Sequence, residues 1–200
     1  MNRLINAHKI LRIGRWAFRW SQLTYIDIRC SSVLTIQQET FKGCCNLVHF
    51  LGDVTTVKNG SFENCHNLRT FQVPELNSIG YSAFKNCWNL ESFPRIGFDV
   101  KRIPDSAFEN CKSLKNLTIF SQILGVNAFA NCYSLFLFIN TIKPIFFEYR
   151  SAYCVANVIC SSKIRGDTPK MHTLHLLFED ERPDPMPDRV YCASGKFLSK

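Results

Sequence analysis

The chain lacks the features that would point to a membrane span or an export signal. Its longest apolar stretch, Leu135 to Phe147, covers about 13 residues and contains Lys143 and Pro144. A membrane-spanning helix needs roughly 20 apolar residues. The N-terminus has no uninterrupted apolar segment of the kind found in signal peptides. Taken as written, the chain therefore predicts a cytoplasmic protein with no membrane span.

Recognisable signatures of catalysis and metal binding are also missing. The ten cysteines include no Cys-x-x-Cys pair, which is a common element of zinc sites. No Ser/His/Asp set, paired acid or phosphate-binding loop recurs at a common place. The sequence therefore predicts a protein that is not an enzyme, with no catalytic residues, no cofactor and no metal.

What the chain does contain is a phrase, Ala-Phe-x-Asn-Cys-x-(Asn/Ser)-Leu, that returns about every 22 residues. Four close copies begin at Ser61, Ala83, Ala107 and Ala128, and looser copies cover 17–23 and 40–47. The phenylalanine falls at positions 18, 41, 62, 84, 108 and 129, in steps of 23, 21, 22, 24 and 21 residues. A fixed period in this range is typical of a solenoid, in which each coil buries its apolar residues against its neighbours.

Each copy of the phrase leads into a strand pattern, Leu-x-x-Phe/Ile/Leu-x-Ile/Val. In Leu68 to Val73 the last four residues alternate apolar with polar, which is typical of a strand with one buried face. A turn, a single apolar residue and a short helical or irregular return segment complete the unit. Stacking these units predicts one parallel sheet along the array.

One repeat position holds a cysteine in five copies, Cys44, Cys65, Cys87, Cys111 and Cys132. We place Trp20 at this position in the first copy, which indicates an apolar niche. Buried cysteine behaves as a small hydrophobe, so reduced core thiols are favoured over disulfides or a metal ladder. The asparagine before the cysteine is expected to hydrogen-bond the backbone of the turn.

These residues resemble the BspA-type leucine-rich repeats, whose pattern is I-x-x-x-A-F-x-x-C-x-x-L-x-x-I-x-I-P. The match covers residues 13–146, about six copies. The resemblance implies an α/β solenoid: a right-handed superhelix with a parallel concave sheet and short irregular or helical convex segments. Members occur in surface-associated proteins of anaerobic bacteria and in parasitic protists. The resemblance therefore implies cell-surface adhesion or host-protein binding, although the chain shows neither a signal peptide nor an anchor.

We divide the chain into a repeat array at 1–146, with about six repeats of 21–24 residues, and a non-repeat C-terminal tail at 147–200. Residues 179–188 are charged and rich in proline, so this part of the tail is predicted to be disordered. The net charge is +8, and its densest basic group is Arg3, Lys9, Arg12, Arg15 and Arg19. Such a group attracts nucleic acid or anionic surfaces. Because no repeat position is consistently basic, a solvated surface is the favoured interpretation and no nucleic-acid partner is expected.

In a strand Leu-x-x-Phe-x-Val, the second, third and fifth residues are available to a partner on the concave face. The candidate protein-binding residues are Tyr25, Asp27, His49, Leu51, Arg69, Thr70, Gln72, Glu91, Ser92, Lys115, Asn116, Thr118, Phe136, Leu137 and Ile139. The last three form an apolar row, which marks either a contact patch or the place where the tail caps the array. Pro94 predicts an irregularity in the fourth strand, because proline donates no ladder hydrogen bond.

The sequence thus predicts a monomeric module that binds a protein ligand of unknown identity. Cell-surface adhesion is one setting for it. An intracellular scaffold is the alternative, and a truncated repeat-family product without independent function is a third possibility.

Overall fold

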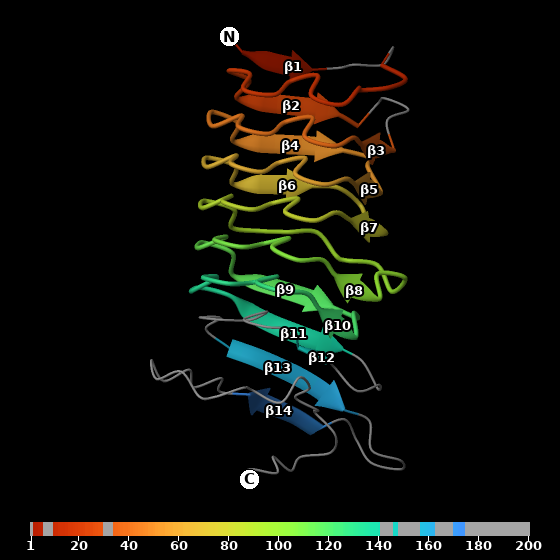
Figure 1. The fold of residues 1–200 in the computed structure, drawn as a ribbon, viewed down its shortest axis with the longest axis vertical. Helices are drawn as coiled ribbons and strands as arrows, with labels where there is room; N and C mark the ends of the chain where they lie inside the picture. Colours follow the sequence, from red (N-terminus) through yellow and green to blue (C-terminus); the bar gives the residue numbers. More distant parts are fainter. Residues whose placement is uncertain are drawn as a thin grey trace.

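The computed structural model describes residues 2–5, 10–29, 34–140, 146–147, 157–162 and 170–174. In these residues the chain forms a parallel β-solenoid of about six coils, stacked along the long axis of the molecule (Figure 1). We number the coils one to six by the phenylalanines of the repeated phrase, Phe18, Phe41, Phe62, Phe84, Phe108 and Phe129.

A main sheet runs along the stack. Its strands are β1 (Arg3–Ile5), β2 (Tyr25–Ile28), β4 (His49–Gly52), β6 (Thr70–Gln72), β9 (Asn116–Ile119), β11 (Phe136–Asn140), β13 (Asn157–Ser162) and β14 (Lys170–Leu174). Paired neighbours are parallel, except that β13 and β14 are antiparallel. The predicted parallel sheet is therefore confirmed.

The main sheet is interrupted at coil four, between β6 and β9. Here only Ser92 bridges to both neighbours, Thr70 and Asn116. Pro94 lies two residues later and has no N–H to continue the ladder. The irregularity predicted from this proline is therefore a gap in strand pairing, which bears on the surface described below.

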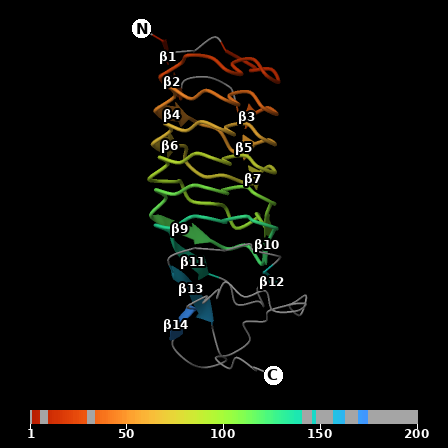
Figure 2. The same cartoon turned by 60° about the vertical axis from the view of Figure 1, so that its left-hand side comes forward.

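Short strands form a second row along a different side of the stack (Figure 2). They form two three-stranded groups, β3 (Thr35–Ile36), β5 (Thr56–Val57) and β7 (Ser78–Ile79), and β8 (Arg102–Ile103), β10 (Ile123–Leu124) and β12 (Phe146–Phe147). In β3, β5, β7, β8 and β10 the single buried residue, such as Ile36 or Val57, is the apolar residue that precedes the next copy of the phrase.

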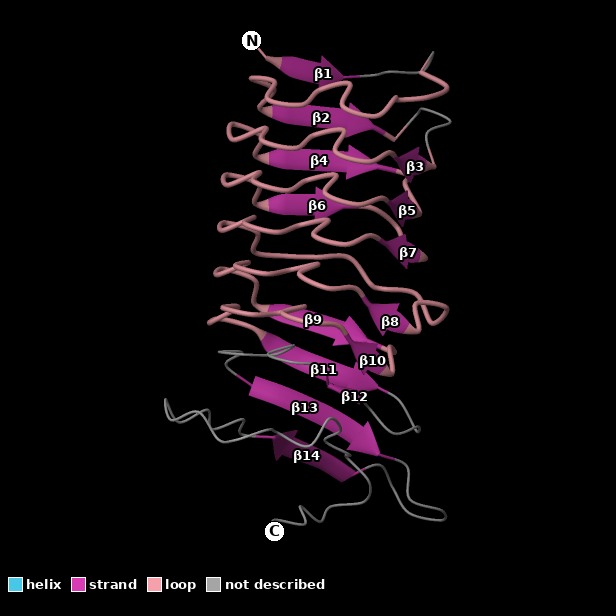
Figure 3. Ribbon diagram, in the orientation of Figure 1, coloured by secondary structure: helices cyan, strands magenta, loops and turns pink. Residues whose placement is uncertain are grey.

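The return segments of the described coils are turns, with no helix among them (Figure 3). Irregular or helical convex segments were expected; the irregular form is found, whereas the helical form and with it the α/β class are not supported, because the described chain is a β-solenoid. Each return segment has two residues with positive φ, for example Ser82 at 51° and Asn86 at 61° on either side of Phe84, whereas a helix requires φ near −60°. The Phe84 N–H instead donates to the Ala107 carbonyl of the next coil at 2.8 Å.

Phenylalanine forms a continuous spine in the core. The rings of the six phrase phenylalanines stack from coil to coil, with centroids 5.2 to 5.6 Å apart. A second column comes from the strands and meets the first edge-on; Phe71, for example, lies 4.9 Å from Phe84. Both arrangements are favourable for aromatic rings.

The cysteine column is part of this core. All five of its thiols are free and buried, as predicted. Each donates to the carbonyl of a phrase phenylalanine in the preceding coil; Cys87 Sγ, for example, lies 3.1 Å from the Phe62 oxygen. The placement of Trp20 in this column is wrong. Ser21 holds that place, 3.3 Å from Cys44 Sγ, and Trp20 is exposed in the column of positive-φ asparagines.

Those asparagines bond to one another rather than to the turn backbone. Asn86 Nδ2 donates to Asn64 Oδ1 at 2.7 Å, and its own Oδ1 accepts from Asn110 Nδ2 at 2.7 Å. Asn131 continues the ladder by donating to Asn110. Asparagine suits this column because it tolerates positive φ and carries both a donor and an acceptor.

Two substitutions of Asn86 should distinguish the contribution of its side-chain hydrogen bonds from the contribution of its tolerance of positive φ. Asn86→Ala loses two side-chain hydrogen bonds and adds backbone strain, so we expect a loss of about 3 kcal/mol in the free energy of unfolding. Asn86→Gly loses the bonds without the strain and should cost about 1 kcal/mol less. Urea unfolding of both variants measures this difference, and equal losses would show that the positive φ carries no strain.

The main sheet continues past residue 146 through β13 and β14. The boundary between array and tail at 146 stays a prediction, and the predicted disorder at 179–188 lies outside the described residues.

Candidate functional site

The outer face of the main sheet presents two columns of side chains that follow the strand register. One column is Arg3, Tyr25, His49, Thr70, Ser92, Asn116 and Phe136. The other contains Asp27, Leu51, Gln72, Thr118 and Phe138. Of the fifteen candidate binding residues, all except Leu137 and Ile139 are exposed or partly exposed.

Leu137 and Ile139 point into the core, so their predicted place on the outer face is wrong. In β11, Phe136 pairs with Asn116 and Leu137 pairs with Leu117. Coil six therefore has one residue fewer than coil five between the phrase leucine and the strand. Because side chains alternate along a strand, this shift exchanges the two faces. Phe136, 43% exposed, and the partly exposed Phe138 occupy the outer face instead.

At the N-terminal end of this face the side chains are already engaged with one another. The Arg3 guanidinium lies 4.4 Å from the centre of the Tyr25 ring, which meets His49 edge-on at 6.0 Å. His49 Nδ1 and Thr70 Oγ1 are 2.8 Å apart. Asp27 accepts hydrogen bonds from Arg29, which lower the pKa of its carboxyl group. These contacts leave few unpaired groups for a partner.

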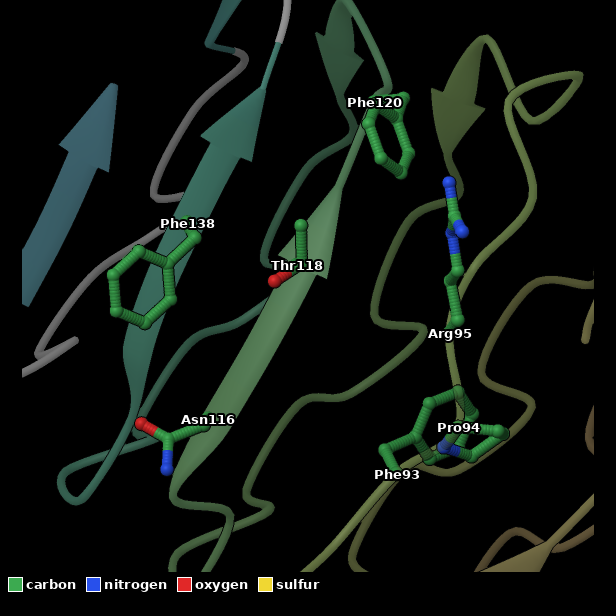
Figure 4. Close-up of a pocket in the computed structure, with 7 residues that line it drawn as sticks. All are labelled: Phe93, Pro94, Arg95, Asn116, Thr118, Phe120 and Phe138. Carbon is green, nitrogen blue, oxygen red and sulfur yellow. The ribbon is translucent and has the colours of Figure 1, made fainter. Parts of the chain in front are cut away.

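A hollowed part of the outer face lies beside the interruption in the sheet. An open groove of about 450 Å³ spans coils four to six (Figure 4). Its lining residues are Phe93, Pro94, Arg95, Asn116, Thr118, Phe120 and Phe138. The groove lies at this place because Pro94 replaces a paired residue beside Thr118, so that the pleated surface is lost locally.

Arg95 lies over an aromatic pair at the edge of the groove. Its guanidinium is 4.5 Å from the Phe98 ring centre and 5.2 Å from that of Phe120, and the two rings are 4.0 Å apart. Its ion pair with Glu75 is exposed and long, at 3.7 Å. Exposed pairs of this kind contribute little free energy, so a partner's carboxylate can replace Glu75.

This combination of groups fits binding better than catalysis. Aromatic and proline walls with a few convergent polar groups are typical of recognition sites. Asn116 supplies an amide, Thr118 a hydroxyl and Arg95 a guanidinium. In the described part of the chain, no His, Cys, Asp and Glu side chains gather into a group suited to a metal ion.

Sequence reasoning missed four residues of the groove: Phe93, Arg95, Phe120 and Phe138. The repeat pattern assigned Phe93, Arg95 and Phe138 to the buried face, and Phe120 lies beyond the predicted strand positions. Pro94 and the 24-residue step from Phe84 to Phe108 were the sequence signals for an irregularity here.

Comparison with known families connects this geometry to a repeat class. A family described as "BspA type Leucine rich repeat region (6 copies)" matches residues 2–91 and 48–151. No curated protein and no solved structure matches the chain significantly. Within the described residues, no helix has the length and apolar character needed to cross a bilayer.

Proposed function

The chain belongs to the BspA-type leucine-rich repeat family, and from this membership and the geometry of the main sheet we propose that it binds a protein partner through the groove of coils four to six. The observation that carries the proposal is the position of this groove on the exposed face of a regular solenoid. It is apolar along its walls, and hydrogen-bonding groups lie within reach of them.

The groove accepts an apolar side chain of the partner between Pro94 and Phe138. A carboxylate next to that side chain meets Arg95, and backbone groups of the partner meet Asn116 and Thr118. Anchors of this kind supply most of the binding free energy of an interface, while surrounding contacts add complementarity. The more distant residues of the outer face, such as Gln72 and Lys115, then form the rim.

A peptide library displayed on phage tests this proposal directly. Peptides are selected on the immobilised full chain and then measured against Thr118→Lys, which places a long charged side chain in the groove. We expect at least a tenfold loss of affinity, typical of a blocked anchor site. The matched control is Ser78→Lys, an exposed residue of the short-strand row.

Two results would contradict the groove as the binding site. One is equal binding of the selected peptides to wild type and Thr118→Lys. The other is an equal loss with Ser78→Lys, which would indicate a general charge effect.

For the setting of this binding, we propose cell-surface adhesion or recognition of a host protein. Family membership supports a protein-binding role, and the surface location follows from the resemblance noted in the sequence. External protease and an antibody against the array, applied to intact native cells, distinguish the settings. Cleavage and staining without permeabilisation would support adhesion, whereas detection only after lysis would indicate an intracellular scaffold.

A further inference from the structure

The first coil carries a concentration of positive charge. Residues 1–26 contain five basic residues, Arg3, Lys9, Arg12, Arg15 and Arg19, and no acidic residue. Arg12 and Arg15 are exposed, and neither forms an ion pair within the described part of the chain. The Arg19 guanidinium forms an ion pair with Glu39 at 3.5 Å and also lies over the Trp20 ring. A partner with negative charge therefore complements this coil.

The same coil exposes large apolar side chains. Leu11 is 71% exposed, Trp16 54% and Trp20 56%. Large exposed apolar residues that occur together in one segment are typical of an interaction site. Three large apolar side chains are thus exposed within ten residues, more than in any other ten-residue segment of the described coils.

The backbone offers no local reason for the two tryptophans. Trp16 and Trp20 both have φ of 60°, at the two positive-φ positions of the coil. In coils four to six the same positions hold serine or asparagine, and asparagine tolerates this conformation better than a bulky residue does. A bulky residue kept in a strained conformation at the surface is a reason to look for a function.

The segment that carries these residues packs against coil two. The backbone N–H groups of Trp16 and Trp20 donate to Gln38 and Lys42 of coil two. The Trp20 ring lies against Gly43, where an added Cβ would come within 2.0 Å of it.

We infer that coil one binds the surface of an anionic lipid bilayer. Arginine is attracted to acidic headgroups, and tryptophan is the residue most typical of the membrane–water interface. Leu11 extends the apolar surface into the acyl boundary. The phosphates of a nucleic acid would pair with the arginines and its bases would stack on the tryptophans, but it has no apolar region that could bury the exposed leucine. The bilayer is therefore the partner that uses all three kinds of side chain.

Sedimentation with lipid vesicles tests this inference on the full chain. Vesicles of phosphatidylcholine with phosphatidylglycerol should carry the protein into the pellet, and vesicles of phosphatidylcholine alone should not. The chain has three tryptophans, so in a Trp88→Phe background only Trp16 and Trp20 report. We expect their fluorescence to shift to shorter wavelength when anionic vesicles are added.

Two double variants distinguish the contribution of the arginine charges to vesicle binding from the contribution of the tryptophan side chains. Arg12→Gln with Arg15→Gln should weaken vesicle binding roughly 25-fold, about fivefold for each arginine near the surface. Trp16→Asn with Trp20→Asn should weaken it at least tenfold. Asparagine suits both positive-φ positions, so this variant should fold as well as wild type, which thermal unfolding verifies. The matched charge control is Lys58→Gln with Lys101→Gln, two exposed lysines of other coils, which should change binding less than threefold.

Any of three results would overturn the inference: no binding to anionic vesicles, an equal loss with the lysine control, or an unchanged affinity of the double asparagine variant. Tight binding of a single-stranded oligonucleotide, lost with Arg12 and Arg15 while vesicles stay unbound, would also overturn it and identify nucleic acid as the partner. Phage-selected peptides should bind every coil-one variant normally, so this test does not depend on the groove.

Discussion

Raising the pH from 8 to 10 should lower the free energy of unfolding by about 4 kcal/mol through the cysteine column alone. Burial raises the pKa of the thiols of Cys65, Cys87, Cys111 and Cys132, the last to about 12. In the unfolded chain a thiol ionises near pH 9.0. Each buried thiol then favours the unfolded state by about 1.4 kcal/mol at pH 10.

The sign follows from which state binds more protons. A thiol with a raised pKa stays protonated in the fold, so its contribution is fully present below pH 9 and is lost as the pH rises above it. Cys44 acts in the opposite direction, because hydrogen bonding with the side chains of Cys65 and Ser21 lowers its pKa to about 7. Its offset over the same interval is about 1.3 kcal/mol, which leaves a net loss of about 4 kcal/mol.

Urea unfolding at pH 8 and pH 10 measures this loss, and serine variants isolate the thiols from lysine and tyrosine. Cys87→Ser removes one titrating group but keeps a donor for the Phe62 carbonyl. The difference between the two pH values should shrink by about 1.4 kcal/mol, and by twice as much when Cys111→Ser is added. Parallel pH profiles for wild type and Cys87→Ser would show that the folded protein lets this thiol ionise.

Phe84→Ala should destabilise the fold by about 3 to 5 kcal/mol. Phe84 is fully buried in the middle of the spine. Its ring stacks on Phe62 and Phe108 and meets Phe71 and Phe93 edge-on. Truncation leaves a cavity between neighbouring coils that rigidly bonded turns cannot close. Since natural domains have about 5 to 15 kcal/mol of stability, this one change can remove most of it.

Phe98→Ala is the matched control for this prediction. It removes the same side chain, but Phe98 is 63% exposed, so the loss should stay within about 1 kcal/mol. Urea unfolding of both variants gives the comparison. Similar losses would mean that the spine is not the main source of stability, whereas failure of Phe84→Ala alone to fold would agree with the prediction.

Much of the array follows directly from the spacing of its residues. Phe62, Phe84 and Phe108 recur at the solenoid period and are buried at equivalent places, and Cys87 lies beside them as a reduced thiol. A pattern repeated six times is averaged over its copies, so irregular residues in one copy do not hide it. The strands were predicted from the alternation of apolar and polar residues in the repeated pattern. Such alternation is typical of a strand with one buried face.

The candidate site was predicted less well, since it depends on departures from the repeat. Pro94 indicated an irregularity, but the groove also needs Phe138, which the pattern assigned to the core. Every residue from Phe136 to Ile139 is apolar. This strand therefore has no alternation of apolar and polar residues that could show which side chains face the core. Only pairing with β9 decided that Leu137 points inward and Phe138 outward.

The sequence by itself determined that this protein is a stack of similar coils with a phenylalanine core, because burial between identical units requires the same residue at the same interval. The tertiary structure decided what the return segments became and where the surface opened. Asn64, Asn86 and Asn110 bond to one another, and the Phe84 N–H bonds to the next coil, only when the coils are in contact. The backbone hydrogen bonds between coils take the place of those within a helix, which was one of the two forms expected for the return segments.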